Sequence, residues 1–169
     1  KWQERMNYVM LDEAQDCNGG DWEIVETLSE KCGNLFIVGD PDQSIYEWRG
    51  AKPERFLAFK ADKDIILDEN YRSTPGILNV ANSIIVNNKN RIDKRMFTRR
   101  GEGEKIVHFH ATDERQEARW ICQEILRRLD NGEAAYSDFA VLFRAAHLSR
   151  FIEQAFIRAN IPYVMWGGV

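Results

Sequence analysis

Short apolar and polar blocks follow one another along this 169-residue chain. Two apolar runs, residues 8–11 and 35–38, are too short for helices and rich in branched side chains, which is typical of buried strands in a parallel sheet. Later apolar runs predict further strands, at residues 64–67, 106–110, 139–143 and 163–166.

Apolar residues at helical spacing lie between these predicted strands. Asp21 is expected to cap a first helix. Lys52 and Thr74, each followed by proline, are expected to begin two more, because proline favours the first helical position. A long amphipathic helix is expected after a cap at residue 112 or 113, and a last helix over residues 148–156. Alternating strands and helices predict an α/β fold with a mainly parallel sheet.

Each of the first two predicted strands ends in a cluster of acidic and amide side chains. Residues 12–16 read Asp-Glu-Ala-Gln-Asp, and residues 39–43 read Gly-Asp-Pro-Asp-Gln. Because ligands bind open parallel sheets at the carboxyl ends of the strands, both clusters are expected to form one site. An apolar strand ending in Asp-Glu suits Mg²⁺ binding beside a nucleoside triphosphate and activation of water. The alternative for an isolated Asp-Glu pair is a helix cap with a solvated carboxylate.

A nucleotide-hydrolysing site of this kind also needs a loop that cradles the phosphates, with the pattern G-x-x-x-x-G-K-[ST]. None of the 11 glycines is followed by lysine, so this Walker A pattern does not occur in the chain. We therefore interpret the chain as part of a longer enzyme whose N-terminal and C-terminal parts are missing. By itself it is expected to be inactive as an ATPase.

The composition limits the cellular environments and the binding partners that can be expected for this chain. No apolar run approaches the ~18 residues that a membrane span needs, so no membrane partner is expected. The three cysteines are scattered, lack metal-ligand spacing and fit a reducing cytoplasm better than a disulfide framework. The formal charge of −4 argues against a strongly basic nucleic-acid coat, so nucleic-acid contacts are expected from local groups and stacking.

Three motifs, taken in order, carry a specific resemblance. Residues 11–16 read LDEAQD, residues 38–51 read VGDPDQSIYEWRGA, and residues 67–74 read LDENYRST. These resemble motifs II, III and IV of the UvrD/PcrA/Rep-type superfamily 1 DNA helicases. A later segment between residues 140 and 168, including Gly167 and Gly168, resembles the next family block, although Phe-Arg-Ala-Ala stands where the family usually has Tyr-Arg-Thr-Asn.

The resemblance implies two RecA-like P-loop NTPase motor domains, both partial, with mainly parallel sheets flanked by helices. Residues 1–63 would be the C-terminal part of the first motor domain, carrying motifs II and III. Residues 64–169 would be the N-terminal part of the second, from motif IV onward. The expected cofactors are therefore ATP and Mg²⁺.

The family pattern also implies a role for individual residues. Asp12 would bind Mg²⁺, and Glu13 would be the base that orients the attacking water. Gln43 would contact the γ-phosphate and couple its presence to DNA binding. Tyr71 would stack on the adenine, and Arg72 would stabilise charge on the γ-phosphate as an arginine finger.

Tyr46, Trp48 and Arg49 lie in the segment that, by resemblance, faces single-stranded DNA. An indole suits this task because it stacks on any base, while core packing is the alternative for Tyr46. The basic segment, residues 91–100, is interpreted either as a solvated loop or as a track for DNA phosphates.

Taken together, the resemblance implies the central fragment of an ATP-dependent DNA helicase. Such an enzyme couples Mg-ATP hydrolysis to translocation on single-stranded DNA and to unwinding at duplex junctions, in DNA repair or replication. One alternative is the motor part of a recombination helicase-nuclease subunit, which a downstream nuclease domain would indicate. The other is a non-catalytic nucleic-acid-binding module derived from a helicase, which the lack of an upstream Gly-Lys-Ser/Thr loop would indicate.

Overall fold

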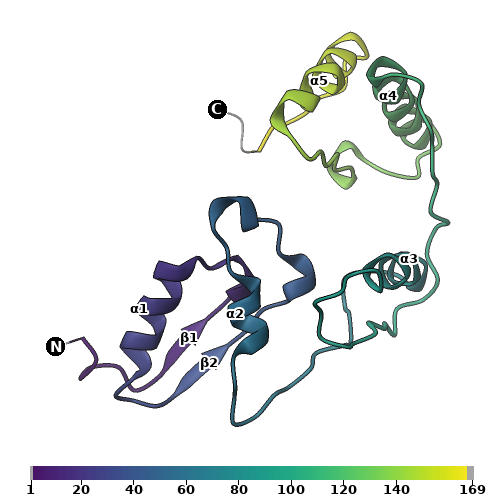
Figure 1. Ribbon diagram of the computed structural model, residues 1–169. Helices are drawn as coiled ribbons and strands as arrows, with labels where there is room; N and C mark the ends of the chain where they lie inside the picture. The colour runs from purple at the N-terminus through teal and green to yellow at the C-terminus, as the bar shows by residue number, and fades with distance from the viewer. Residues whose placement is uncertain (1, 167–169) are drawn as a thin grey trace. The chain divides into compact units, whose positions relative to one another are not determined.

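The computed structural model describes residues 2–166. Gly167 and Gly168, in the last sequence block, lie outside this range. The chain divides into two compact units, Lys1–Ile106 and Val107–Val169. Figure 1 shows the helices and strands of both units, and each unit is described by itself below.

The sheet of the first unit pairs β1 (Val9–Leu11) with β2 (Leu35–Ile37) in parallel, with Val9 opposite Leu35 (Figure 1). Backbone contact continues past both strands, since the N–H of Val38 donates to the carbonyl of Leu11 at 2.8 Å. The N–H of Ala14 in turn donates to the carbonyl of Val38 at 3.0 Å. The first two predicted strands and their parallel pairing are therefore confirmed, and their polar ends lie at the same edge. Their predicted burial is not, since Met10 and Phe36 are 75% and 54% exposed.

Helix α1 (Gly19–Ser29) connects the two strands and begins with a capping box. The Oδ1 atom of Asn18 accepts hydrogen bonds from two N–H groups of the first turn, at 2.8 and 3.1 Å. In return, Oδ2 of Asp21 accepts a hydrogen bond from the N–H of Asn18 at 3.0 Å. The prediction that Asp21 caps this helix is wrong: Asp21 is the third helical residue and completes the box, while Asn18 is the cap.

Helix α2 (Pro53–Ala58) begins at the predicted proline, and Arg55 within it and Phe59 directly after it contact Trp22 of α1. Trp22 is only 1% exposed, and its ring lies 6.3 Å from that of Phe59, centroid to centroid. The guanidinium of Arg55 lies 5.7 Å from the centre of the indole. These contacts attach both helices to one small apolar core beside the strands.

Helix α3 (Pro75–Ile85) also begins at its predicted proline. Thr74 occupies the cap position, but its side chain makes no capping hydrogen bond. Leu78 is the buried residue of this helix. Proline at the first position, rather than the threonine hydroxyl, is thus the feature of the sequence that fixes the start of α3.

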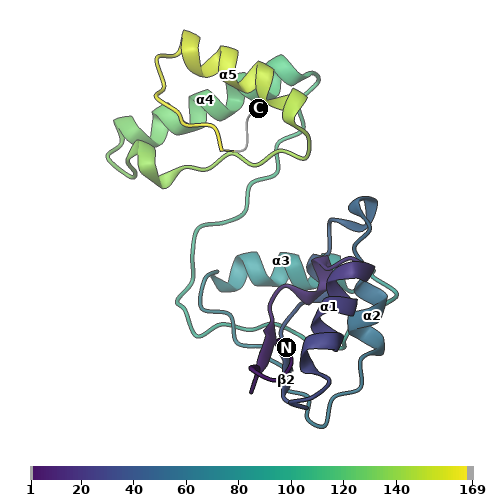
Figure 2. The ribbon, with the colours of Figure 1, turned by 90° about the vertical axis from the view of Figure 1, so that its left-hand side faces the viewer.

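The second unit packs α4 (Glu114–Asp130) against α5 (Ser149–Arg158) (Figure 2). Asp113 caps α4, because its Oδ1 accepts from the N–H of Gln116 at 2.6 Å. This settles which of the two predicted cap residues acts. The core between the helices consists of buried side chains from both and from the following segment: Cys122, Ile125, Phe156 and Ile161.

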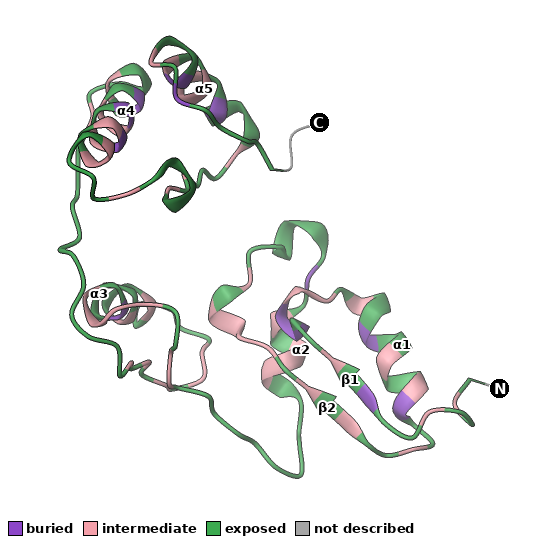
Figure 3. Ribbon diagram, turned by 180° about the vertical axis from the view of Figure 1, so that it is seen from behind, coloured by how far each residue is buried: buried purple, intermediate pink, exposed green. Residues whose placement is uncertain are grey.

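None of the four later apolar runs forms a strand in the described part of the chain, so these four predictions are wrong. Ile65 and Leu67 are 64% and 79% exposed, and Leu142 is 93% exposed. Figure 3 shows the long connection between α2 and α3 coloured mostly as exposed. A strand needs a neighbour that completes its backbone hydrogen bonds, and within residues 2–166 these segments have none. Within residues 2–166 the sheet is accordingly a single parallel pair, and the remaining elements are helices, short turns and extended segments.

Candidate functional site

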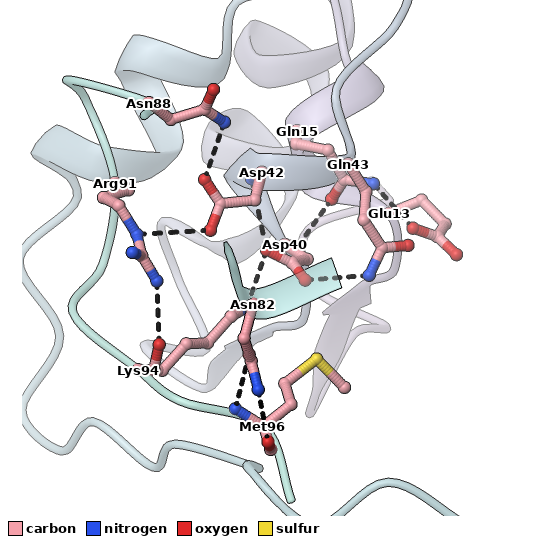
Figure 4. A network of polar contacts seen from close by, with 10 residues as sticks. All are labelled: Glu13, Gln15, Asp40, Asp42, Gln43, Asn82, Asn88, Arg91, Lys94 and Met96. Atoms are coloured by element: carbon pink, nitrogen blue, oxygen red, sulfur yellow. Dashed lines mark hydrogen bonds and ion pairs between the residues drawn. The ribbon is translucent and has the colours of Figure 1, made fainter. Parts of the chain in front are cut away.

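The candidate site lies at the carboxyl ends of β1 and β2, where both polar clusters are found. Asp12 and Glu13 directly follow β1 and are exposed. The chain after β2 folds into a short 3₁₀ turn, η2 (Pro41–Gln43), capped by Asp40, which accepts from the N–H of Asp42 at 3.1 Å. Figure 4 shows the polar contacts that surround this turn.

Glu13 has a backbone conformation that is unusual for its residue type. Its φ and ψ are 50° and 43°, in the left-handed region that non-glycine residues seldom occupy. Its N–H donates to Oδ1 of Asp12 at 2.9 Å. The next two residues, Ala14 and Gln15, are fully buried, so this turn separates the exposed carboxylates from the core below them.

Gln15 joins the two clusters through one side-chain amide. It is 1% exposed, and its Nε2 donates to Oε2 of Glu13 at 2.7 Å. Its Oε1 accepts from the N–H of Asp40 at 2.9 Å (Figure 4). An amide can bind a residue of each cluster because it carries both a donor and an acceptor. The sequence marked Gln15 as part of the polar run but gave it no role.

Asp40 extends this connection to Gln43, whose Nε2 donates to Oδ2 of Asp40 at 2.8 Å. A continuous path of hydrogen bonds therefore joins Glu13 to Gln43 through Gln15 and Asp40. Burial raises the pKa of Asp40, but hydrogen bonds from Lys94 and Gln43 outweigh this effect, so the pKa lies below its usual value. Asp40 is thus an ionised acceptor at neutral pH.

Gly39 allows the close approach on which this path depends. A Cβ atom at residue 39 would lie 2.7 Å from Oε1 of Gln15 and 3.2 Å from the backbone nitrogen of Ala14. We expect Gly39→Ala to lower the free energy of unfolding by about 1–3 kcal/mol, because the buried amide must move. Chemical denaturation of the chain measures this loss. Gly101→Ala is the matched control, since a Cβ there meets nothing within 4 Å. Equal stability of the two variants would contradict the role of Gly39.

Two cations of the basic segment fit neither interpretation. Nζ of Lys94 lies 2.6 Å from Oδ1 of Asp40, and Nε of Arg91 lies 3.6 Å from Oδ2 of Asp42. The side chains of Lys94 and Arg91 are only 14% and 13% exposed. These two cations are therefore paired with carboxylates of the site, rather than being solvated or free to follow phosphates. Arg95, which directly follows Lys94, is exposed.

Tyr71 and Arg72 lie in a turn that two side chains stabilise. Oδ1 of Asn70 accepts from the N–H groups of Arg72 and Ser73, at 3.0 and 2.7 Å. Nη1 of Arg100 donates to the carbonyls of Tyr71 and Arg72, both at 3.1 Å. The sequence gave no role to Arg100. Its partners are backbone carbonyls, which every residue has, so no pattern of side chains indicates the contact.

The side chain of Tyr71 is 76% exposed. A hydrogen bond to Glu69 raises the pKa of its phenol above the usual value. Among the described residues, no hydrogen bond or ion pair joins Tyr71 or Arg72 to Glu13 or Gln43. The structure thus brings together the residues of the two strand ends, but does not link those of the third motif to them.

The three residues expected to face DNA form one exposed cluster around a second 3₁₀ turn, η3 (Glu47–Arg49). Trp48 is 73% exposed and Tyr46 is 36% exposed. The guanidinium of Arg49 lies 5.4 Å from the centre of the Tyr46 ring and 5.7 Å from that of Trp48. An exposed ring beside a cation is available for stacking, so core packing, the alternative considered for Tyr46, describes neither ring.

Comparison with known protein families agrees with the motifs and their order. Residues 1–64 match the model of the UvrD/REP helicase N-terminal domain, and residues 65–169 match that of the UvrD-like helicase C-terminal domain. This chain belongs to the UvrD-like helicases. The resemblance noted in the sequence is confirmed, and membership implies a RecA-like α/β fold.

Curated members of the UvrD-like family are similar to this chain along nearly its whole length. The ATP-dependent DNA helicase PcrA of Leuconostoc citreum is 41% identical over 172 residues. The protein of the same name from Staphylococcus aureus strain Mu50 is 43% identical over 171 residues. Each alignment covers 99% of this chain but only 23% of the relative's length.

A UvrD-like helicase is expected to use Mg²⁺ with ATP, and the donors at the strand ends fit that ion. Mg²⁺ is usually bound by one or two carboxylates together with waters and substrate phosphates. Asp12 offers an exposed carboxylate at the end of β1, with Glu13 next to it. Within residues 2–166, no group of three or more His, Cys, Asp or Glu side chains forms a complete metal site. Such a donor set suits an ion held jointly with a nucleotide.

Proposed function

We propose that this chain is the central, ATP-handling part of an ATP-dependent DNA helicase that translocates on single-stranded DNA and unwinds duplexes. The observation that carries the proposal is the hydrogen-bonded path from Glu13 to Gln43 through Gln15 and Asp40. It links the proposed water-orienting carboxylate to the proposed γ-phosphate contact. The names of the PcrA relatives support the whole-protein activity, although the chain spans 23% of their length.

In this proposal each side chain at the strand ends performs one task. Asp12 would hold Mg²⁺, which would neutralise charge on the nucleotide phosphates when bound. Glu13 accepts a hydrogen bond from the attacking water and takes its proton. Gln43 has two N–H groups on its amide, of which one donates to Asp40. The other can donate to a γ-phosphate oxygen, so Gln43 detects that phosphate.

Tyr71 and Arg72 would act on the nucleotide from the other half of the motor. The exposed ring of Tyr71 offers a flat face to the adenine. The guanidinium of Arg72 can neutralise the transferred phosphoryl group with two parallel hydrogen bonds. Asn70 and Arg100 hold the backbone of this turn, so the turn presents both side chains together.

Trp48→Ala in the intact protein is expected to weaken binding of single-stranded DNA and to reduce stimulation of ATP hydrolysis by DNA. Stacking on an aromatic ring contributes ~1–3 kcal/mol per base, so affinity should fall by about five- to 150-fold, whatever the DNA sequence. Fluorescence anisotropy with labelled oligonucleotides of different composition measures this change. Trp2→Ala is the matched control, because Trp2 is also exposed, at 66%.

The rate of ATP hydrolysis without DNA distinguishes a loss of DNA stacking from damage to the ATP site. We expect the Trp48 variant to retain this basal rate, since its ring lies in the proposed DNA-facing cluster and not at the strand ends. A lowered basal rate, or unchanged DNA affinity, would contradict the stacking role.

We also propose that the motor domains meet between residues 63 and 64, as the motifs indicate. The extents of the two family models, which meet between residues 64 and 65, support this boundary. The proposed partners are single-stranded DNA, duplex junctions and the remaining N-terminal and C-terminal parts of the same polypeptide, in the cytoplasm. Among residues 2–166, no helix has the length and apolar character needed to cross a bilayer.

The test of this function is ATP hydrolysis by the intact protein with and without single-stranded DNA, together with unwinding of a tailed duplex. We expect DNA to stimulate hydrolysis and ATP to be required for unwinding. The 169-residue chain alone is the negative control, because it has no Walker A loop. DNA binding without hydrolysis would favour a non-catalytic binding module, and DNA cleavage would favour a helicase-nuclease subunit.

A further inference from the structure

The segment after α3 folds into a defined loop over the η2 turn. This clamp loop, residues 87–96, is attached to α3 at its far end, where Nδ2 of Asn82 donates to the carbonyl of Met96 at 2.8 Å. The N–H of Met96 donates back to Oδ1 of Asn82 at 3.2 Å (Figure 4). Within the loop, Nη2 of Arg91 donates to the carbonyl of Lys94 at 2.7 Å. The loop is therefore shaped by its own polar contacts.

Three side chains of the clamp loop hold the two carboxylates of the η2 region. Lys94 lies on Asp40, with Nζ 2.6 Å from Oδ1. Asp42 receives a hydrogen bond from Nδ2 of Asn88 at 3.0 Å on one oxygen, and the guanidinium of Arg91 lies 3.6 Å from the other (Figure 4). The side-chain partners of Asp42 come from the loop, while Asp40 has Lys94 in addition to the N–H of Asp42 and the amide of Gln43.

Burial distinguishes these pairs from the surface pairs of the chain. The side chains of Asp40 and Asp42 are 17% and 5% exposed. In the surface pair of Lys52 and Glu54, by contrast, the side chains are 51% and 66% exposed. Exposed pairs add little, whereas removal of one partner from a buried pair leaves an uncompensated charge. The contacts of the clamp loop therefore constrain the η2 turn.

We propose that Lys94 is a positioning residue for Gln43, which it orients through the carboxylate of Asp40. Oδ1 of this carboxylate faces Lys94 and also accepts from the N–H of Asp42, while Oδ2 accepts from Gln43. Lys94 and this N–H together fix the plane of the carboxylate and so the direction in which the amide of Gln43 points. Arg91 and Asn88 support the same turn through Asp42. The inference rests on the proposed function, since it assigns a task to the γ-phosphate contact.

The two ends of this clamp belong to different family domains. Gln43 and Asp40 lie in the part that matches the N-terminal domain, and Lys94 lies in the part that matches the C-terminal domain. The orientation of Gln43 consequently depends on contact between the two parts. Lys94 makes the phosphate contact competent only while the clamp loop covers the η2 turn.

The test compares Lys94→Met, Lys94→Arg and Lys89→Met in the intact protein. Lys89 is an exposed lysine of the same loop and serves as the matched control. We expect Lys94→Met to lower the DNA-stimulated kcat by about 10²-fold with little change in KM for ATP, because displaced groups near reacting atoms cost about this much. Lys94→Arg should recover most of the rate. A normal kcat in Lys94→Met, or the same loss in Lys89→Met, would overturn the inference.

A double-mutant cycle separates positioning from simple loss of folding. If Lys94 acts through Asp40, adding Asp40→Asn to Lys94→Met should lower kcat little further, because both changes break the same path. The pair also leaves no charge unpaired, so it should fold even if Lys94→Met alone does not. Losses that multiply would overturn the inference.

A readout without catalysis keeps this inference distinct from the proposed function. In the 169-residue chain, the side-chain amide NMR signals of Gln43 should shift in Lys94→Met and stay in place in Lys89→Met. Unchanged signals would overturn the clamp even if the intact protein is an active helicase. An inactive wild-type protein with shifted signals would instead remove the helicase proposal and leave the clamp standing.

Discussion

Replacement of Arg72 by alanine is expected to lower kcat of the intact helicase by about 10³- to 10⁵-fold, the range found for positioned arginines in phosphoryl transfer. The affinity for ATP should change far less, because the guanidinium acts mainly where charge develops on the transferred group. Single-turnover hydrolysis, combined with equilibrium binding of a fluorescent ATP analogue, separates the two quantities.

Two further variants sharpen the Arg72 experiment. Arg72→Lys should recover little activity, because an ammonium cannot make the two parallel hydrogen bonds of a guanidinium. Arg95→Ala removes an exposed arginine of the basic segment and should leave kcat unchanged. If kcat survives in Arg72→Ala, the arginine-finger role must be withdrawn, whatever the other variants show.

Glu13→Gln should lower the DNA-stimulated kcat by about 10²- to 10⁴-fold, the usual contribution of a general base. ATP binding and folding should be retained, because the new side chain has the same shape and its oxygen can still accept from Nε2 of Gln15. Rapid-quench kinetics and ATP-binding titrations measure the two effects.

Glu23→Gln, an exposed change on α1, is the control for Glu13→Gln and should behave as wild type. A Glu13→Gln protein that hydrolyses ATP normally would show that another group activates the water. If the melting temperature of this variant falls sharply, Glu13 has a structural task that the proposal omits.

The sequence predicted the features that depend on neighbouring residues. The two short strands, the helix starts at Pro53 and Pro75, and the shared edge of the acidic clusters follow from local apolar runs and from proline chemistry. The role of Asp21 was misjudged by three positions, because Asn18 and Asp21 both suit a cap and only the backbone decides between them.

The missing strands show the limit of local reasoning. Residues 64–67 and 139–143 have the apolar content of strands, yet a strand exists only where a neighbour accepts its hydrogen bonds. The run over 139–143 still contributes apolar side chains, since Phe139 and Val141 pack against the helical core of the second unit. Apolar content thus predicted core contacts for only part of these runs, since Ile65, Leu67 and Leu142 are exposed.

The contacts of the clamp loop were not predictable from local pattern. Lys94 pairs with Asp40, and Arg91 pairs with Asp42, across about fifty residues of sequence. A row of basic residues looks the same in sequence whether it faces water, phosphate or a carboxylate. Gln15 was similarly hidden, because its role depends on two strands meeting side by side.

The left-handed backbone of Glu13 implies a conflict between the stability of the fold and the rate of ATP hydrolysis. A non-glycine residue in this conformation costs about 1–3 kcal/mol, which glycine avoids. Selection of this protein for heat resistance alone is therefore expected to favour Gly or Asn at residue 13, at the expense of turnover. At φ 50°, Glu13 is therefore expected to combine a cost in stability with the carboxylate that the proposed reaction needs.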